Sequence, residues 1–363
     1  MIMEISPQTC TIADLYKSNG GKVSDKWELY LREYERLLAP YRGKAVSLLE
    51  IGIQNGGSLE RWAQYFPEGT SFIGCDINET CRALRYGDER ISVVVGDANA
   101  PEVAAQILGR SADFDIIIDD GSHRSSDVIK SFARFFPALK EGGVFIAEDM
   151  HCSYWKDYEG GLFYPLSAVA FFKRLADITS HEHWGVPLAR HAVLAPFVDA
   201  YGEEFNEECL RTIHSVEFVN SMCVVTKQPV ATNTLGRRIV SGHEDLVWPG
   251  AKALHLQPHV AVVETGNEWS DISRLPEAER ARLLAALEAR EAERDGLVER
   301  AKDARALIAE AARRESELEA QVLTERSAHK AAQQALLREV QELRRSTSWR
   351  ITAPLRALRS LFK

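Results

Sequence analysis

Short apolar runs alternate with amphipathic stretches from Val46 onward. Five runs predict strands in chain order: VSLLEIG, SFIGCDI, ISVVVGD, FDIIIDD and GGVFIAED. Continuous apolar runs rich in β-branched residues are typical of strands that are covered on both faces. Because helix-like segments separate the runs, the pattern predicts a doubly wound, Rossmann-like α/β fold with a parallel sheet.

Two further segments extend this α/β domain, which we place at residues 43–230. The segment HSVEFVNSMCVVTKQ predicts two short strands around Asn220 and Ser221, as an antiparallel hairpin at the end of the sheet. Residues 1–42 contain the helical stretch KWELYLREYERLLAPY. We expect them to form an N-terminal helical lid across the mouth of a ligand site.

The chain changes character after the α/β domain. Residues 231–274 are irregular, with Pro249, Gly250 and Pro258, and are predicted to be a linker. Residues 275–345 are dominated by Ala, Glu, Arg, Leu and Gln, which is typical of a long helix or coiled coil. A heptad frame can be drawn through them, although charged residues interrupt it. We therefore expect a homo-oligomer formed by a coiled coil, with a single solvated helix as the alternative. The apolar positions of the frame include Leu283, Leu287, Leu297, Ile308, Leu318, Val322, Leu336 and Leu343.

The last segment, residues 346–363, is basic and amphipathic. No acidic residue follows Glu342, and Trp349, Ile351 and Leu355 supply an apolar side. Such a segment can bind an anionic membrane surface or a partner protein, and a frayed tail is the alternative. We expect a peripheral membrane contact or a contact with a glycosyltransferase complex.

Composition narrows the functional classes. The chain has 363 residues, 45% hydrophobic content and a net charge of -9, so it can bury a full core and is not expected to bind nucleic acid. Its six cysteines form no CxxC pair, which indicates reduced thiols. No apolar segment is long enough to span a bilayer. We therefore expect a cytoplasmic protein that the tail can hold at the inner face of the membrane.

A cofactor crevice is predicted at the ends of the first three strands. The first strand runs through Glu50 into Gly52 and Gly56, where glycine lets the backbone approach a ligand closely. The second strand ends at Asp76, where a carboxylate can bind ribose hydroxyls, and Asp97 follows the third. The dinucleotide pattern GxGxxG is missing. These residues alone leave a nicotinamide-dependent enzyme and a methyltransferase both open.

The order of these motifs resembles class I S-adenosylmethionine-dependent methyltransferases over residues 1 to about 230, hairpin included. LEIGIQNGGSLERWAQYFP followed by FIGCDIN is similar to the subgroup of macrolide-sugar and rhamnosyl O-methyltransferases and the cephalosporin hydroxylase-like proteins. Gln54 stands where the superfamily usually has its middle glycine. The resemblance implies S-adenosylmethionine as cofactor, with cofactor-binding residues Glu50, Gly52, Asn55, Gly56, Ser58, Asp76, Asp97 and Asp119.

Four acidic residues follow the fourth and fifth strands. Asp119 and Asp120 lie in IIIDDGSH, and Glu148 and Asp149 lie in IAEDMH. Neighbouring strands are about 4.8 Å apart, so these carboxylates would repel one another unless a cation neutralised them. Oxygen ligands favour Mg²⁺ or Mn²⁺. His123 follows Asp120 closely, and an imidazole can act as a general base near neutral pH.

The same subgroup of sugar O-methyltransferases has this spacing of acids and histidine. The resemblance implies that Asp120, Glu148 and Asp149 bind the metal, that His123 is the catalytic base, and that Asp119 belongs to the cofactor side. It also implies a sugar or glycan acceptor. The tail STSWRITAPLR resembles the ends of coiled-coil regions on bacterial surface-polysaccharide enzymes, and this resemblance implies a role in surface polysaccharide biosynthesis. Aromatic residues after the fifth strand, Tyr154, Trp155 and Tyr158, are expected on the acceptor side.

Two other functional classes remain as alternatives. One is a nicotinamide-dependent oxidoreductase, which the missing GxGxxG and the clustered acids disfavour. The other is a non-catalytic coiled-coil scaffold with a ligand-binding α/β domain. A scaffold has no electrostatic reason to retain four mutually repelling acids beside a histidine.

Overall fold

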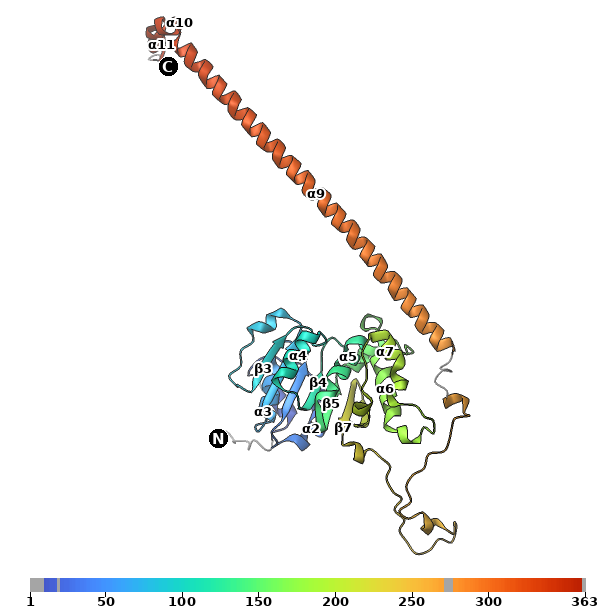
Figure 1. The fold of residues 1–363 in the computed structure, drawn as a ribbon. Helices are drawn as coiled ribbons and strands as arrows, with labels where there is room; N and C mark the ends of the chain where they lie inside the picture. Colours follow the sequence, from blue (N-terminus) through green and yellow to red (C-terminus); the bar gives the residue numbers. More distant parts are fainter. Residues whose placement is uncertain (1–9, 18–19, 271–276, 361–363) are drawn as a thin grey trace, which may run out of the picture. The chain divides into compact units, whose positions relative to one another are not determined.

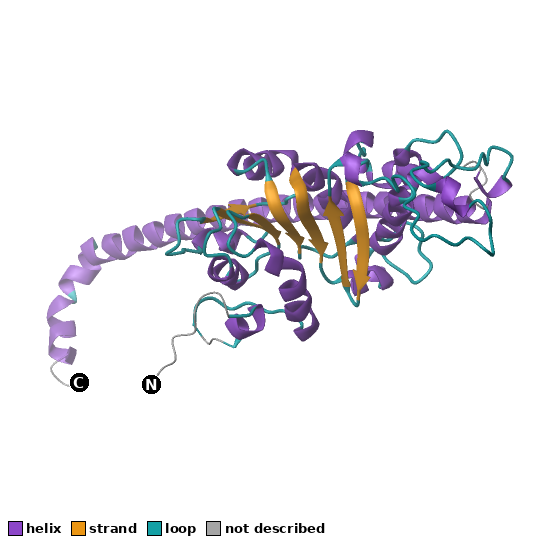
Figure 2. Cartoon of the chain, turned by 90° about the horizontal axis from the view of Figure 1, so that it is seen from below, coloured by secondary structure: helices purple, strands orange, loops and turns teal. Residues whose placement is uncertain are grey.

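A computed structural model describes residues 10–17, 20–270 and 277–360, with the backbone alone described for 277–288 and 357–360. The chain divides into two compact units, Met1–Leu283 and Leu284–Lys363. The first unit is built on a seven-stranded sheet with the strand order β3-β2-β1-β4-β5-β7-β6 (Figures 1 and 2). The strands are β1 (Ser47–Ile51), β2 (Ser71–Asp76), β3 (Ile91–Val95), β4 (Phe114–Asp119), β5 (Leu139–Ala147), β6 (Ile213–Val219) and β7 (Met222–Lys227).

The sheet is mixed in the way that the sequence predicts. Strands β1 to β5 run parallel, while β7 pairs antiparallel with both β5 and β6. The two-residue turn between β6 and β7 includes Ser221 at φ 65°, a left-handed conformation of the kind that tight hairpin turns use. The predicted Rossmann-like methyltransferase sheet with a terminal antiparallel hairpin is confirmed.

Helices cover both faces of this sheet, as the view from below shows (Figure 2). Side chains alternate along the strands, so Leu49 and Ile117 join one buried cluster, whereas Leu48 and Ile118 join the other. The first cluster also contains side chains of α4, α5 and α6, and the second contains side chains of α1, α2 and α3. The helices of this unit are α1 (Ile12–Tyr16), α2 (Glu28–Leu38), α3 (Gly57–Tyr65), α4 (Pro101–Arg110), α5 (Ser125–Phe135), α6 (Ala168–Thr179), α7 (Ala195–Tyr201) and α8 (Glu207–Leu210).

Helix α2 packs an aromatic face against α3 and the sheet. Tyr30, Tyr34 and Leu38 are buried at helical spacing, and the Tyr34 ring meets the Trp62 ring edge-on with centroids 5.0 Å apart. The described part of residues 1–42 thus contains the helices that the sequence predicts. The role of these helices as a lid stays a prediction.

The second unit consists of most of the long helix α9 (Glu277–Arg345), followed by α10 (Thr347–Ile351) and α11 (Ala353–Ser360). Ser346 ends α9 and caps α10, because its side chain accepts the Trp349 N–H. Within the part of the chain that the structure describes, no helix combines the length and apolar character needed to cross a membrane.

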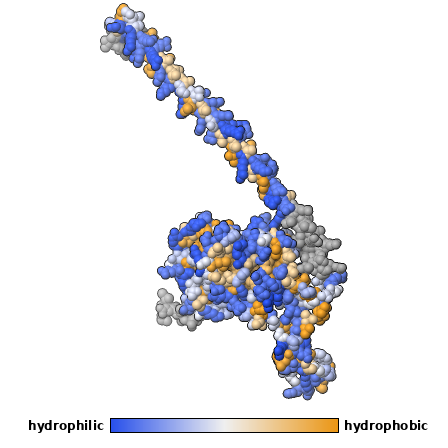
Figure 3. Space-filling model, viewed as in Figure 1, coloured by the Kyte–Doolittle hydropathy of each residue, from blue (hydrophilic) through white to orange (hydrophobic). Residues whose placement is uncertain are grey.

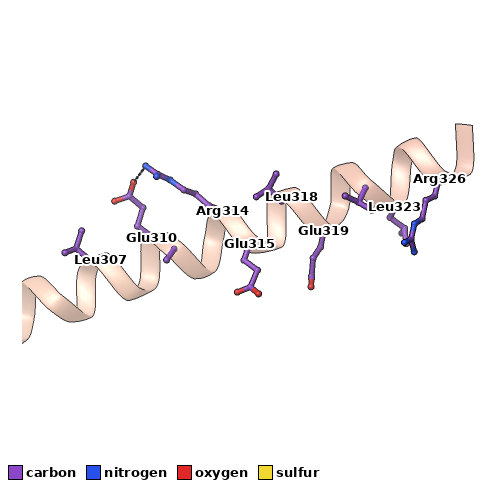
Figure 4. Close-up of a pocket in the computed structure, with 10 residues that line it drawn as sticks. Leu307, Glu310, Arg314, Glu315, Leu318, Glu319, Leu323 and Arg326 are labelled. Atoms are coloured by element: carbon purple, nitrogen blue, oxygen red, sulfur yellow. Dashed lines mark hydrogen bonds and ion pairs between the residues drawn. The ribbon is translucent and has the colours of Figure 1, made fainter. Parts of the chain in front are cut away.

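Apolar side chains are exposed along α9, interspersed with charged ones (Figure 3). Figure 4 shows side chains of one stretch of α9, among them Leu307, Leu318 and Leu323, with an ion pair of 2.5 Å between Arg314 and Glu310. All of them belong to a single helix, so no opposing wall encloses them. The long helix is as expected, whereas its pairing into a coiled coil stays a prediction. The side chains of Leu283 and Leu287 lie outside the described residues, as do those of the tail from residue 357 onward.

Candidate active site

A cavity of about 540 Å³ opens where the parallel strands end. Strands β1 and β4 are neighbours there although β2 and β3 intervene in sequence, and such a switch point is the usual ligand site of a doubly wound sheet. Among the described residues, Glu50, Asn55 and Gly56 are outside the cavity wall, and their cofactor roles stay predictions. The predicted site residues that line the wall are Gly52, Ser58, Asp76, Asp97, Asp119, Asp120, His123, Glu148 and Asp149.

The turn after β1 approaches the β4 loop very closely. Gly52 has φ 85°, and a Cβ on it would lie 1.9 Å from the carbonyl oxygen of Asp120. Gly56, at φ 76°, is the N-cap of α3, and a Cβ there would lie 2.0 Å from the Tyr86 hydroxyl. Both positions therefore favour glycine for the conformation, and Gly52 requires it for the space as well. Gly52 brings the ends of β1 and β4 together at the wall of the cavity.

Asp76 organises the same turn through hydrogen bonds to backbone amides. Its Oδ2 accepts the N–H groups of Ile53 at 3.0 Å and Gln54 at 2.8 Å, and its Oδ1 accepts the Asn78 N–H at 2.8 Å. Oδ1 therefore keeps a further lone pair for a ligand hydroxyl. Asp97 stands in the same wall and accepts the Asn99 N–H at 2.9 Å. The ribose and adenine roles of the two acids are not tested by these contacts and stay predictions.

Glu50 is completely buried behind the cavity wall. Its Oε2 accepts hydrogen bonds from Ser58 Oγ at 2.6 Å and Trp62 Nε1 at 3.1 Å, which tie α3 to β1. Its Oε1 has no hydrogen bond and lies 3.7 Å from the ammonium of Lys26. Burial raises the pKa of the Glu50 carboxyl, although Lys26 and Ser58 oppose the rise.

Lys26 lies among the acids of the site. Its side chain is 2% exposed, and its Nζ is 2.7 Å from Glu148 Oε1 and donates to Asp120 Oδ2. Burial disfavours the charged amine, but Glu148, Asp120 and Glu50 outweigh burial and hold the pKa of Lys26 well above its usual value. Burial likewise raises the pKa of Glu148 to about 8 and raises that of Asp120, with Lys26 opposing both shifts.

Asp149 connects helix α2 to His123. Its Oδ1 accepts hydrogen bonds from Trp27 Nε1 at 3.2 Å and the Tyr30 hydroxyl at 2.8 Å, and its Oδ2 lies 3.7 Å from His123 Nε2. Asp120 Oδ1 is 4.0 Å from the same nitrogen. His123 and Asp149 have φ values of 59° and 51°, which non-glycine residues adopt rarely and often at functional sites. The two carboxylates thus face one imidazole.

Asp120 and Asp149 can hold a divalent metal ion, with His123 beside them. One ligand atom each from Asp120, His123 and Asp149 lies within 4.8 Å of the others. One oxygen of each carboxylate accepts a hydrogen bond from the N-terminal segment, and the other faces His123. The oxygens that face His123 are hard ligands of the kind that Mg²⁺ prefers. Glu148 instead contacts Lys26 and the Tyr34 hydroxyl. Its predicted role as the third acidic metal ligand stays a prediction.

Aromatic residues border the acids on the side of β7. The turns η4 (Met150–Tyr154) and η5 (Lys156–Tyr158) follow Asp149, and His151 Nδ1 contacts Ser221 Oγ. The rings of His151 and Trp155 meet edge-on with centroids 4.8 Å apart, and Trp155 is half-exposed. A flat ring of this kind can stack on the apolar face of a sugar.

The sequence reasoning missed the contributions of Lys26, Trp27, Tyr30 and Tyr34. A signal for three of them exists in KWELYLREY, because Trp27, Tyr30 and Tyr34 recur at intervals of three and four, on one face of a helix. Lys26 has no such signal. A lysine before an amphipathic helix is usually solvated, and only the fold brings it to the acids.

Comparisons with known proteins show similarity to methyltransferases. A sequence model of the "Methyltransferase domain" family matches residues 49–150. The chain is 36% identical over 171 residues, 44% of each chain, to 8-demethyl-8-alpha-L-rhamnosyl tetracenomycin-C 2'-O-methyltransferase of Streptomyces olivaceus. It is 34% identical over 189 residues, 48% of this chain and 47% of the other, to demethylmacrocin O-methyltransferase of Streptomyces fradiae. It thus spans less than half the length of these curated relatives.

A solved structure is also similar: the MycE methyltransferase of the mycinamycin biosynthetic pathway, in complex with Mg, SAH and mycinamycin VI. The TM-score is 0.49 with 26% sequence identity, over 65% of this chain and 56% of that one. Residues 49–150 thus match a methyltransferase-domain model, and the first unit has the Rossmann-like methyltransferase fold. More particularly, the chain is related to the macrolide-sugar O-methyltransferases.

Proposed function

We propose that this protein transfers a methyl group from S-adenosylmethionine to a hydroxyl group of a sugar or glycan, with Mg²⁺ or Mn²⁺ as a second cofactor. The observation that carries the proposal is the position of His123 Nε2, which faces Asp120 and Asp149 at the wall of the cavity that also contains Gly52 and Asp76. The relatives support the sugar acceptor, because their names describe methylation of rhamnosyl and macrolide groups.

His123 is the proposed general base. It accepts the proton of the acceptor hydroxyl at Nε2, so that the oxygen can bond to the methyl carbon while the bond from that carbon to sulfur breaks. Asp149 and Asp120 then stabilise the protonated imidazole, because both carboxylates face the same nitrogen. His123 thus takes up the proton within the same pocket that holds the methyl donor and the acceptor together.

Asp120 and Asp149 are the acids that would hold the divalent ion, with Glu148 as the predicted third ligand. When bound, the ion would lower the pKa of the acceptor hydroxyl. Trp27 and Tyr30 fix the Asp149 carboxylate, and Lys26 contacts that of Asp120. Gly52, Ser58, Asp76, Asp97 and Asp119 are the cavity residues proposed to bind S-adenosylmethionine, with Glu50, Asn55 and Gly56 supporting the same turn.

Radiolabelled S-adenosylmethionine tests this function directly. Purified full-length protein is incubated with Mg²⁺ and a panel of acceptors that includes demethylmacrocin, L-rhamnosides and rhamnose-containing glycans. We expect label in at least one sugar, loss of transfer in EDTA, and recovery with Mg²⁺ or Mn²⁺. Full transfer in EDTA would contradict the metal role, and calorimetric binding of NADH in place of S-adenosylmethionine would contradict the donor.

The context of the reaction forms a further part of the proposal. We propose a cytoplasmic enzyme of surface polysaccharide biosynthesis that self-associates through α9 and contacts a membrane or a glycosyltransferase complex through its tail. The exposed apolar residues of α9 and the basic residues Arg350 and Arg356 of the tail support this context.

A further inference from the structure

Three carboxylates from different strand ends surround the ammonium of Lys26. Glu50 belongs to β1, Asp120 follows β4 and Glu148 follows β5. Lys26 Nζ donates to Asp120 Oδ2, lies 2.7 Å from Glu148 Oε1 and lies 3.7 Å from Glu50 Oε1. An ammonium has three N–H donors, and here each of them has a carboxylate within reach. The Lys26 ammonium is therefore a positive charge, supplied by the chain itself, among three acidic side chains.

Lys26 belongs to a segment that crosses the start of α3. We call residues 20–27 the strap. Lys22 holds Glu60 through its Nζ and its backbone N–H, both at 2.7 Å, and the Gly57 N–H donates to the Val23 carbonyl at 3.1 Å. A Cβ on Gly57 would lie 2.3 Å from the Lys22 carbonyl oxygen, so the backbones are in close contact. Residues 23–27 of the strap also line the cavity.

Lys26 and the proposed metal depend on the same acids. Asp120 and Glu148 are both predicted metal ligands, and both have an oxygen engaged by the Lys26 ammonium. Two cations that share these ligands within a few ångströms repel each other in a buried site, where water screens them poorly. Glu148 is 2% exposed, so it cannot turn to solvent to serve the two cations separately.

We propose that Lys26 and a divalent cation compete for Asp120 and Glu148, so that metal entry withdraws Lys26 and releases the strap. This inference rests on the proposed function, because it takes the metal from there. Lys26 then controls whether the metal site is occupied. Metal binding in turn releases the strap, which borders the cofactor cavity. A lysine that merely supported the acids would instead make metal binding tighter by its presence.

Calorimetric titration with Mn²⁺ distinguishes the two roles. The full-length wild type is compared with Lys26→Met, which keeps the side chain's length and removes its charge, and with Lys44→Met, which removes an exposed lysine that lies outside both the cavity wall and the strap. We expect Lys26→Met to bind Mn²⁺ at least tenfold more tightly than the wild type, and Lys44→Met to bind within about twofold of it. Equal or weaker binding by a folded Lys26→Met overturns the competition alone. No binding by any of the three overturns it together with the proposed metal dependence.

Trypsin digestion of the wild type gives a second readout that needs no variant. Trypsin requires an accessible lysine side chain, and that of Lys26 is buried. Saturation with Mn²⁺ should increase the rate of cleavage after Lys26 severalfold, while cleavage after the exposed Arg110 at the end of α4 keeps its rate. Unchanged or slower cleavage after Lys26 in the Mn²⁺-bound protein overturns the withdrawal of the lysine.

Discussion

His123 Nε2 lies 3.7 Å from Asp149 Oδ2, while Tyr30 and Trp27 hold the other oxygen of the same carboxylate. The pair joins the β4 loop to the β5 loop, and helix α2 fixes the acid that faces the histidine. A carboxylate fixed beside a base can stabilise the protonated imidazole without first moving into place. This relationship makes His123 the first residue to test.

Substitution His123→Ala should lower kcat for methyl transfer by roughly 10³-fold, the range typical of a lost general base. Binding of S-adenosylmethionine, measured by calorimetry, should stay within about twofold, because the cofactor turn is formed by other residues. The matched control is His214→Ala, since His214 is exposed and bonds only to Asn233 among the contacts described. A loss of less than tenfold in His123→Ala would show that another group takes the proton.

The Tyr34 hydroxyl should contribute measurably to stability. It donates to Glu148 in a fully buried position, so Tyr34→Phe leaves a buried carboxyl group with one partner fewer. We expect a loss of about 1–3 kcal/mol in the free energy of unfolding, measured by urea denaturation. Tyr201→Phe, which removes a 2.8 Å hydrogen bond to the partly buried Leu166 carbonyl, should cost less. Equal costs would mean that the Glu148 contact is no more important than an ordinary hydrogen bond.

The strand ends could be predicted from the sequence because the fold dictates where they meet. Once five apolar runs indicate a parallel sheet, Asp76, Asp120 and Asp149 must emerge at one edge, and the structure places them in one cavity wall. The hydrophobic pattern and the glycines of the first turn are local signals. They were sufficient to predict the fold and the hairpin, and the composition of residues 275–345 was sufficient to predict the long C-terminal helix.

The partners of the acids could not be predicted in the same way. The contact between Trp27 and Asp149 joins residues 122 positions apart, and no periodicity in the chain records such a pairing. Ser58 and Trp62 supply the donors that hold the Glu50 carboxylate, and no local pattern in the sequence indicates that pairing. Lys26 contacts three acids that lie far from it in the sequence. Long-range side-chain contacts of this kind depend on tertiary packing rather than on a local sequence pattern.

Gly52 should tolerate no side chain. In Gly52→Ala, the left-handed backbone alone costs about 1–2 kcal/mol, and the new Cβ would overlap the Asp120 carbonyl oxygen at 1.9 Å. We expect S-adenosylmethionine binding to fall at least tenfold in calorimetry, together with a lower melting temperature. The control is Gly109→Ala, on the exposed side of α4 with open space around it, which should raise the melting temperature slightly. Retained cofactor affinity in Gly52→Ala would contradict the role of this turn.

Glu159 should make stability depend on pH. It accepts the Ser126 N–H at 3.0 Å in the first turn of α5 and pairs with Arg124 at 2.6 Å. Burial opposes the shift, but these donors hold the pKa of Glu159 below its ordinary value near 4.5. Because the folded pKa is the lower one, the contribution is fully present above the unfolded pKa and is lost as the pH falls through the folded pKa.

The variant Glu159→Gln should therefore lose about 1–2 kcal/mol at neutral pH, and the difference from the wild type should shrink as the pH falls below about 4.5. Thermal unfolding at several pH values measures it. Glu208→Gln, at an exposed ion pair with Arg211, should change stability by less than about 0.5 kcal/mol throughout. A difference for Glu159→Gln that stays constant with pH would mean that its charge has no part in the effect.

Helix α9 offers a matched pair of leucines for testing self-association. Leu318 lies in the predicted heptad seam, whereas Leu323 lies beside it, and both are exposed in the single chain at 60% and 72%. Lysine at a seam position places two like charges against each other in a paired helix, but lysine outside the seam remains in water. Sedimentation velocity should therefore show an oligomer for the wild type and Leu323→Lys, and monomers for Leu318→Lys at the same concentration. Equal sedimentation of the two variants would contradict this seam, and a monomeric wild type would contradict self-association itself.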